Sequence, residues 1–274
     1  MSIEQHDAEA LADRLLGASD AGKPLAPITN EHPGFDLADA YRVSAAARQH
    51  RVGRGERPVG WKIGFTNRSV WPSLDIDAPI WGPMYDTTVS ETKPVGTTSF
   101  SLAGLASPRI EPEIGFRLAT APDPGMDEDE LLACVDAVTH GFEIVQSVYP
   151  DWKLKAPDGV AAGGLHARYA HGPLVPIEPA ERPRWARMLK ELSITIFRDG
   201  VEMDRGMGTA VLDGPVSALR HLVANMAKFP GYALRPGDLV TTGTITKAYP
   251  VAPGERWSTK LEGIPLPGMD LALS

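Results

Sequence analysis

The sequence predicts an α+β fold, in which a small helical segment (residues 1–55) precedes a larger body of strands and helices (residues 56–274). The first observation is the spacing of apolar residues near the N-terminus, where they recur every three or four positions as on one face of a helix. The second is a set of apolar runs of strand length, over residues 59–67, 110–116, 138–145, 192–197 and 239–244. With 27 glycines and 25 prolines, the chain is rich in turn-forming residues.

Two helices are predicted in the N-terminal segment. Residues 4–17 carry a stripe of alanine and leucine with polar residues opposite. A linker rich in glycine and proline, residues 22–27, follows it. The second helix is predicted to begin near Asp36, whose side chain can cap it. Both helices are interpreted as structural.

The composition restricts partners and compartment. The 274 residues, 43% of them hydrophobic, can bury a full core. The net charge of −8 argues against nucleic acid or an anionic membrane as the main partner, so an anionic substrate needs a metal or a lysine nearby. The single cysteine, Cys134, excludes an intrachain disulfide framework. Because the N-terminus is polar and no apolar run approaches the roughly 20 residues that span a bilayer, we expect a cytoplasmic protein.

Residues 59–67 predict a strand that carries Lys62 between aromatic and aliphatic neighbours, with a glycine on each side. A partly desolvated lysine has an easily shifted pKa and suits catalysis or carboxylate binding. The alternative is a lysine on the solvent face of an edge strand. Residues 74–82 follow as a loop whose acids, Asp77 among them, are of a kind more often used to form turns.

Glu111 and Glu113 lie two residues apart in the apolar run of residues 110–116. Side chains alternate between the faces of a strand, so both carboxylates project from the same side. Their repulsion would raise one pKa unless a cation lies between them, and oxygen ligands suit Mg²⁺, Ca²⁺ or Mn²⁺. Glu143, in the apolar run of residues 138–145, is the best candidate for a third acid. The alternative for the first two glutamates alone is a solvated strand face.

The chain between these acidic strands is predicted to run as strand, loop, helix and strand. An acidic turn at residues 122–129 leads to a helix near residues 129–137. Such an excursion can bring Glu143 back beside the strand that carries the pair. The acids of residues 127–130 lack the spacing and central glycine of an EF-hand, so they are interpreted as acids at a helix N-terminus.

Two polar loops follow, at residues 151–155 and 163–168. Loops of this sort often close over a site, and we expect Lys155 to contribute to substrate binding. His166 and His171 are candidates for acid/base work. The alternative is that each histidine is a hydrogen-bonded structural residue.

The last third of the chain is predicted to contain a strand, a hairpin turn, a helix and a second strand, over residues 192–197, 199–200, 215–229 and 239–244. The second strand ends at a glycine between two threonines. The backbone amides there, with the hydroxyls of Thr242 and Thr244, can bind a carboxylate or carbonyl oxygen of a substrate.

Several familiar catalytic motifs are absent from the sequence. It contains no G-x-S-x-G elbow, H-E-x-x-H pair, Walker A loop, complete G-x-G-x-x-G or paired cysteines. Serine hydrolase, zincin, nucleotide-binding and redox functions therefore lose most of their support.

Four motifs, in order along the chain, are similar to those of one known family. They are GWKIGFT at residues 60–66, IEPEIGF at 110–116, FEIV at 142–145, and PGD with TGT at 236–238 and 242–244. From about residue 36 to its end, the sequence resembles the 2-keto-4-pentenoate hydratase and 4-oxalocrotonate decarboxylase family of the fumarylacetoacetate hydrolase superfamily. The resemblance implies a mixed β-roll with peripheral helices for the catalytic domain, a Mg²⁺ or Mn²⁺ site, a 2-oxo acid substrate and a homo-oligomeric enzyme.

The resemblance also implies roles for individual residues. The family's metal-binding carboxylates correspond to Glu111, Glu113 and Glu143, and its active-site lysine corresponds to Lys62. An acid in the loop after that lysine corresponds to Asp77, and the hydroxyl of the family's turn corresponds to Thr244. One motif departs. After Asp-Trp-Lys many members carry an Ala-Asp-Asn-Ala-Ser type stretch that helps to set the substrate, whereas here residues 161–166 stand in its place. We predict that His166 is the replacement polar group.

Together these residues predict a metal-dependent hydratase in the catabolism of aromatic or related compounds. A 2-oxo acid or its enol would chelate the cation through its C1 carboxylate and C2 oxygen, and water would add at C4. Lys62, Asp77 or His166 would move the protons. Decarboxylation of the oxalocrotonate type and hydrolytic C–C cleavage of an acylpyruvate share this metal site and are alternatives. A non-catalytic relative would have lost a metal ligand or the lysine, and neither is lost.

Overall fold

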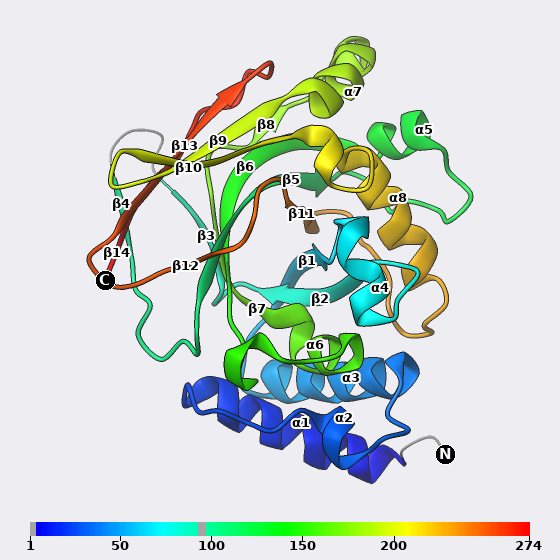
Figure 1. Ribbon diagram of the computed structural model, residues 1–274. Coiled ribbons are helices and arrows are strands. Elements are labelled where there is room, and N and C mark those ends of the chain that lie inside the picture. Colours follow the sequence, from blue (N-terminus) through cyan, green and yellow to red (C-terminus); the bar gives the residue numbers. More distant parts are fainter. Residues whose placement is uncertain (1–3, 93–96) are drawn as a thin grey trace.

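Two mixed β-sheets with helices packed around them form the body of the protein (Figure 1). The computed structural model describes residues 4–92 and 97–274. Within these residues the larger sheet has nine strands: β1 (Pro58–Gly64), β2 (Ile80–Tyr85), β3 (Val89–Glu91), β5 (Arg109–Leu118), β6 (Val135–Val145), β7 (His166–His171), β8 (Val175–Pro176), β11 (Leu239–Thr244) and β12 (Tyr249–Pro250). Their order is β2-β1-β11-β5-β6-β7-β3, with β12 paired to β5 and β8 paired to β6.

The smaller sheet comes mainly from the C-terminal third. Its strands in the described residues are β4 (Thr98–Phe100), β9 (Ser193–Arg198), β10 (Val201–Met207), β13 (Arg256–Glu262) and β14 (Asp270–Leu273), in the order β10-β9-β13-β14-β4. The hairpin turn between β9 and β10 is confirmed at Asp199 and Gly200, whose φ angles of 51° and 80° suit a tight turn with both residues left-handed.

The N-terminal segment is helical, as predicted. It forms α1 (Gln5–Asp20), α2 (Ile28–Glu31) and α3 (Leu37–Gly53), which lie below the larger sheet in Figure 1. Asp36 caps α3, because its carboxylate accepts a hydrogen bond from the Asp39 amide at 2.9 Å. Tyr41 of α3 stacks on Trp81 of β2 with ring centroids 4.2 Å apart, so this segment shares a core with the body. The domain boundary at residue 55 stays a prediction.

The other helices lie between the strands in sequence. The α-helices are α4 (Trp71–Leu74), α5 (Glu128–Ala133), α6 (Ala156–Ala161), α7 (Arg182–Glu191) and α8 (Pro215–Met226), and the short 3-10 helices are η1 (Arg68–Val70), η2 (Pro150–Trp152), η3 (Gly163–Leu165), η4 (Pro179–Glu181) and η5 (Gly208–Ala210). Helix α8 confirms that a helix begins at residue 215, as predicted, but it ends at Met226 and not at residue 229. No helix in the described part of the chain has the length and apolar character needed to cross a membrane.

Among the predicted element boundaries that are wrong, two concern residues 74–82 and 129–137. The loop predicted at residues 74–82 ends early, because Ile80 already pairs with β1 as the first residue of β2 and is buried. The helix predicted near residues 129–137 ends at Ala133. From Val135 onward the chain pairs with β5, and an extended ladder of backbone hydrogen bonds there replaces further helical turns.

A hydrophobic cluster between the two sheets fixes which way β5 and β6 face. Ile110 of β5 and Phe142 and Ile144 of β6 belong to this cluster, together with residues of β9, β13 and β14. Since alternate residues of a strand point to opposite faces, the glutamates that follow Ile110 and Phe142 point away from the cluster. The apolar contacts between the sheets thus direct Glu111 and Glu143 to one side.

Candidate metal centre and active site

Three glutamates on β5 and β6 converge on one face of the larger sheet. In the antiparallel pairing, Glu111 lies opposite Glu143, and Glu113 follows on the same face of β5. One carboxylate oxygen of each residue lies within 4.8 Å of those of the other two. Glu113 and Glu143 are 0% exposed. The structure therefore brings together the three carboxylates that the sequence singled out.

The surroundings of these carboxylates oppose their ionisation. Burial raises the pKa of Glu111 to about 8, with Lys62 acting against the rise and Glu143 adding to it. Burial also raises the pKa of Glu113 well above its ordinary value, and Glu143 adds to this rise. The pKa of Glu143 is raised as well, again mainly by burial. Three negative charges are stable in this volume only beside cations.

The oxygens available at the cluster fit a hard divalent cation. Oε1 of Glu113 is buried and has no hydrogen-bond partner among the described residues, whereas its Oε2 accepts from the Gly243 amide at 2.9 Å. Gly243 has a φ of +92°, and a Cβ there would lie 2.1 Å from Oγ1 of Thr66, so glycine is required at this turn. An oxygen-only set with an unpaired buried carboxylate oxygen is the donor set that Mg²⁺, Mn²⁺ or Ca²⁺ prefers.

Lys62 is buried beside the glutamates. Its strand, β1, lies between β2 and β11, and its side chain is 4% exposed. Nζ lies 3.1 Å from Oε2 of Glu143. Burial alone would lower the pKa of Lys62, but Glu143, Glu111 and Glu113 together outweigh burial and hold it above its ordinary value. The lysine is therefore charged, and the alternative of a solvent-facing lysine is excluded.

His166 contacts the metal centre through Glu143. The loop predicted at residues 163–168 is in fact η3 followed by β7, and His166 is the first residue of that strand. Its Nδ1 donates to Oε1 of Glu143 at 2.8 Å, and its Nε2 lies 2.9 Å from the Thr88 hydroxyl. Burial, with Lys62 next in importance, holds the pKa of His166 well below its usual range. The ring is therefore neutral, and since Nδ1 carries the proton, Nε2 accepts from Thr88.

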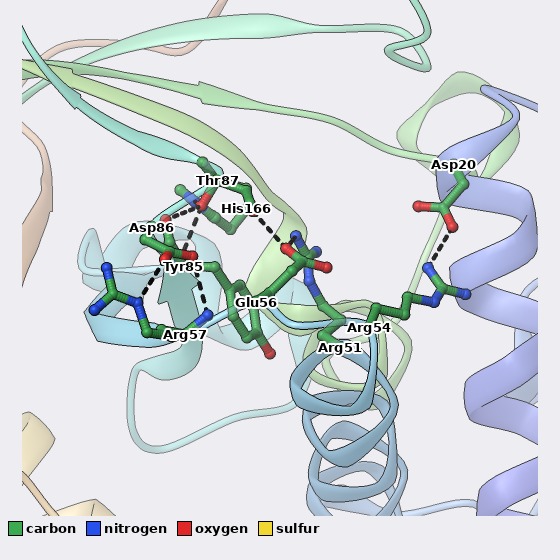
Figure 2. A network of polar contacts seen from close by, with 10 residues as sticks. Asp20, Arg51, Arg54, Glu56, Arg57, Tyr85, Asp86, Thr87 and His166 are labelled. Carbon is green, nitrogen blue, oxygen red and sulfur yellow. Dashed lines mark hydrogen bonds and ion pairs between the residues drawn. The ribbon is translucent and has the colours of Figure 1, made fainter.

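The turn that supports His166 is tied to the N-terminal helices. Figure 2 shows His166 beside the turn that carries Tyr85 and Thr87. Glu56 accepts from Arg51 at 2.6 Å and from the Thr87 hydroxyl at 2.5 Å, which links helix α3 to this turn (Figure 2). The environment of Glu143 thus depends on residues far from it in sequence.

Lys62 and Glu111 line a cavity of about 570 Å³, a volume typical of small-molecule sites. Apolar side chains form part of its wall, among them Phe65, Val145 and Leu165. His166 is not among the residues that line it. A small acid bound here would meet charged groups, Lys62 and Glu111 among them, as well as apolar side chains.

The sequence pattern of the family described as fumarylacetoacetate (FAA) hydrolase, C-terminal, matches residues 84–266. The chain belongs to the fumarylacetoacetate hydrolase family. The matched residues include all three glutamates and the glycine turn beside them.

Full-length relatives place the chain in one branch of this family. It is 31% identical over 257 residues to 2-hydroxyhexa-2,4-dienoate hydratase of Comamonas testosteroni, covering 93% of this chain and 94% of the relative. It is 29% identical over 259 residues to 4-oxalocrotonate decarboxylase of Pseudomonas sp. strain CF600, covering 93% of each. The structure of 4-oxalocrotonate decarboxylase from Pseudomonas putida G7, complexed with magnesium and adipate, aligns over 100% of this chain and 99% of that chain, with 25% identity and a TM-score of 0.91. The family and fold expected from the four motifs are confirmed.

Of the two threonines beside Gly243, only one lines the cavity of this fumarylacetoacetate hydrolase fold. Thr242 is 0% exposed, and its hydroxyl donates to the Ile114 carbonyl at 2.9 Å, which holds β11 to β5. Thr244 lines the cavity, although its hydroxyl donates to the Thr246 carbonyl at 3.0 Å. The Thr242 hydroxyl is therefore buried and already bonded within the sheet, so the prediction that it binds the substrate is wrong.

The structure does not bring Asp77 and Lys155 to the cavity. Both residues are exposed, and neither is among those that line it. The backbone amide of Lys155 donates to the Asp158 carboxylate at 2.9 Å, at the start of α6. The expectation for Asp77 came from the family resemblance and that for Lys155 from its place in a polar loop, and in the structure both side chains are exposed to solvent. His171 is structural, since its Nδ1 donates to the Gly172 carbonyl at 2.7 Å.

Sequence reasoning missed two residues, Thr88 and Arg109. Thr88 gives no local signal, because its contact with His166 joins residues 78 positions apart. Arg109 lines the cavity and does give a signal. It lies two positions before Glu111, so the alternation that paired Glu111 with Glu113 also places Arg109 on that face.

Proposed function

We propose that this protein is a metal-dependent hydratase that adds water to a 2-hydroxydienoate, or to the unsaturated 2-oxo acid formed from it, in the catabolism of aromatic or related compounds. The observation that carries the proposal is the convergence of three carboxylates beside a buried, charged lysine, with Glu111 and Lys62 of this group lining the cavity. The relatives named as hydratases support the same reaction type. The chain is an enzyme of the hydro-lyase type.

Glu111, Glu113 and Glu143 would hold the cation, for which we propose Mg²⁺ or Mn²⁺. A divalent ion held there would coordinate the C1 carboxylate and C2 oxygen of a 2-oxo acid and would stabilise the negative charge that develops on the C2 oxygen. A solved relative contains magnesium, which supports this choice. The amide of Gly243 keeps Glu113 oriented by its bond to Oε2, while Oε1 is left for the cation.

The remaining chemistry belongs to side chains of the cavity. Lys62 is charged and lines the cavity, so it would donate a hydrogen bond to an oxygen of the substrate. As the enol becomes a ketone, Lys62 would give a proton to C5 and take back the proton that the C2 hydroxyl loses, which leaves the lysine charged as before. Water then adds its hydroxyl at C4 and its proton at C3. Phe65, Val145 and Leu165 contact the carbon chain and limit the access of other water molecules.

We assign His166 a positioning role in this mechanism. Its Nδ1 proton holds Oε1 of Glu143, so that Oε2 faces Lys62 and the cation. Because both ring nitrogens are occupied within the protein, His166 acts through Glu143 and not on the substrate. Asp77 and Lys155 have no part in the proposal.

Decarboxylation of an oxalocrotonate is the second candidate. The match of the whole chain to 4-oxalocrotonate decarboxylases favours it, since the same enolate forms when CO₂ leaves. Hydrolysis of an acylpyruvate would use the same metal centre. We further propose that the enzyme is a homo-oligomer in the cytoplasm, which light scattering of the purified protein and fractionation of its host would test.

A spectrophotometric panel separates these reactions. Purified protein with Mg²⁺ or Mn²⁺ is given 2-hydroxypenta-2,4-dienoate, 2-hydroxyhexa-2,4-dienoate, oxalocrotonate and an acylpyruvate. We expect loss of the dienoate absorbance together with formation of a 4-hydroxy-2-oxo acid. Release of CO₂ from oxalocrotonate without hydration of any dienoate would contradict the proposal and favour the second candidate.

A further inference from the structure

Tyr169 is a fully buried residue of β7 that the proposed mechanism does not use. It lies opposite Glu143 in the pairing of β6 with β7, so its side chain starts from the face that carries the three glutamates. Its hydroxyl lies 2.8 Å from the point where a Cβ on Gly115 would lie, and 2.5 Å from the corresponding point on Gly141. These two glycines therefore make room for the ring, which crosses β6 and reaches β5.

The position of the ring brings its hydroxyl beside Glu113. This glutamate lies two positions before Gly115 on β5 and directly opposite Gly141 on β6. The pKa of the tyrosine agrees with this placement. Burial raises the pKa of Tyr169 well above its usual range, and the nearby Glu113 adds to the rise. The tyrosine therefore faces the metal centre.

Thr241 of β11 faces the same point from the other side. It lies opposite Gly115 in the pairing of β11 with β5, so its side chain shares the face of the glutamates. Burial raises the pKa of Glu113, and Thr241 acts against the rise, which indicates that its hydroxyl is near the carboxylate. Neither Thr241 nor Tyr169 is among the residues that line the cavity, so a substrate bound there would not contact them.

Three polar atoms at this point have no hydrogen-bond partner within the described part of the chain. They are the Tyr169 hydroxyl, Oγ1 of Thr241 and Oε1 of Glu113, and all three residues are 0% exposed. A buried polar atom without a partner destabilises a protein, so three of them at one point indicate a partner that they share. Water bridges polar groups that do not bond directly, and a buried water typically makes about three hydrogen bonds.

We propose that Tyr169 and Thr241 hold a buried water molecule against Oε1 of Glu113, which makes Tyr169 a positioning residue of the metal centre. The inference rests on the proposed function, in which Glu113 is a metal ligand. The water donates to Oε1, which has lone pairs for both the water and the cation, and it accepts from the Tyr169 hydroxyl. Together with the Gly243 amide on Oε2, it fixes the orientation of the carboxylate.

Two variants that preserve side-chain shape test the proposal. Tyr169→Phe and Thr241→Val each remove one partner of the water. Titration of Mn²⁺, followed by electron paramagnetic resonance, measures the Kd of the metal without a substrate. We expect this Kd to rise by about tenfold in each variant, as is typical when a residue that orients a metal ligand is removed. Because both hydroxyls act through one water, the double variant should also show a rise of about tenfold, whereas independent effects would multiply to about 100-fold.

Tyr149→Phe is the matched control. Tyr149 is also 0% exposed, but its hydroxyl donates to the Asp158 carbonyl at 3.0 Å, in α6. Its replacement should lower Tm and leave the Kd of Mn²⁺ unchanged. Thr241→Ser retains the hydroxyl that bonds the water, so it should keep the Kd of the wild type.

A tyrosine hydroxyl that is buried without any partner predicts a different result. Its removal in Tyr169→Phe would raise the Tm of the metal-free protein and leave the Kd of Mn²⁺ unchanged, and this result would overturn the proposal. A rise of about 100-fold in the double variant would exclude a shared water. A crystal structure of the Mn²⁺-loaded wild type is a second measurement that does not depend on the folding of any variant. We expect an ordered water within hydrogen-bond distance of all three atoms, and the proposal is wrong without it.

The metal titration also separates this inference from the proposed function. If the wild type and both single variants bind Mn²⁺ equally well, the role of Tyr169 is wrong and the metal centre stands. If the wild type does not bind Mn²⁺, the proposed function fails together with the inference.

Discussion

The two ends of the β5–β6 pair place charged side chains in opposite surroundings. At one end Glu111, Glu113 and Glu143 lie together, two of them fully buried, and Nζ of Lys62, from β1 on the far side of β11, lies 3.1 Å from Glu143. At the other end Arg117 and Asp136 form an ion pair with 2.8 Å between Nε and Oδ1, and both side chains are about 40% exposed.

The difference shows why only one of these charge clusters has a function. An exposed ion pair such as Arg117 with Asp136 contributes about 0–1 kcal/mol, because water screens it and compensates either partner alone. Buried carboxylates cost several kcal/mol each unless cations and hydrogen bonds compensate them. Three buried carboxylates that lie side by side despite this cost indicate a site that binds a ligand. The predictions below compare the three glutamates with the exposed ion pair.

The largest effect is expected at Glu143, which contacts both Lys62 and His166. Glu143→Gln keeps the volume but removes a metal ligand, so we expect kcat/KM to fall by about 10³-fold or more and Mn²⁺ affinity to fall with it. Electron paramagnetic resonance titration of Mn²⁺ and the hydratase assay measure the two. Asp136→Asn, at the exposed end of the same strand, is the control. Wild-type Mn²⁺ affinity in Glu143→Gln would overturn the assignment of the metal centre.

Lys62→Met should have the next largest effect. Methionine keeps an apolar stem of similar length but removes the charge, so the expected fall in kcat/KM is about 10²-fold, with the fold retained. Lys260→Met, on the exposed side of β13, should leave activity unchanged. Steady-state kinetics and circular dichroism check both. Kinetics equal to wild type would remove Lys62 from the mechanism.

Removal of the metal should destabilise the protein, and more so at higher pH. A ligand present at a hundred times its Kd stabilises the folded state by about 2.7 kcal/mol, which chelation with EDTA abolishes. In the metal-free protein the folded pKa of Glu111, about 8, exceeds its ordinary value of 4.5, so the stability associated with its protonation is lost as pH rises between these values. The fall in Tm on adding EDTA should therefore be larger at pH 8.5 than at pH 6. An equal Tm with and without metal at both pH values would contradict the metal centre.

A smaller effect is expected at Thr88, which supports Glu143 only through His166. Thr88→Val removes the hydroxyl that donates to Nε2, so Mn²⁺ affinity should fall by about tenfold, the lower end of the range for residues that orient a metal ligand. Thr88→Ser should restore it. Loss of stability without any change in Mn²⁺ Kd would show a purely structural role.

The smallest effect should come from the exposed ion pair. Arg117→Gln should change the free energy of unfolding by less than about 1 kcal/mol and leave kcat/KM unchanged. Urea denaturation and the hydratase assay measure both quantities. A fall in kcat/KM as large as that expected for Lys62→Met would contradict the conclusion that only the buried end of the strands has a catalytic role.

Much of the fold and the centre of the site could be predicted from the sequence because their signals are local. The alternation along β5 places Glu111 and Glu113 on one face, and the apolar neighbours of Glu143 predict that it is buried. The capped helix after Asp36 and the tight turn at Gly200 depend on residues within a few positions of each other. The sequence by itself therefore determined the family, the three carboxylates and the lysine beside them.

The tertiary structure decided which other side chains reach these groups. Asp77 and Lys155 are near the site in sequence but exposed in space, whereas Thr88 and His166 are distant in sequence and in contact. Such outcomes depend on turns and strand pairing, which no local pattern of apolar and polar residues specifies. Only when β7 pairs with β6 does His166 reach Glu143, because the register between two strands is set by the packing of both of them.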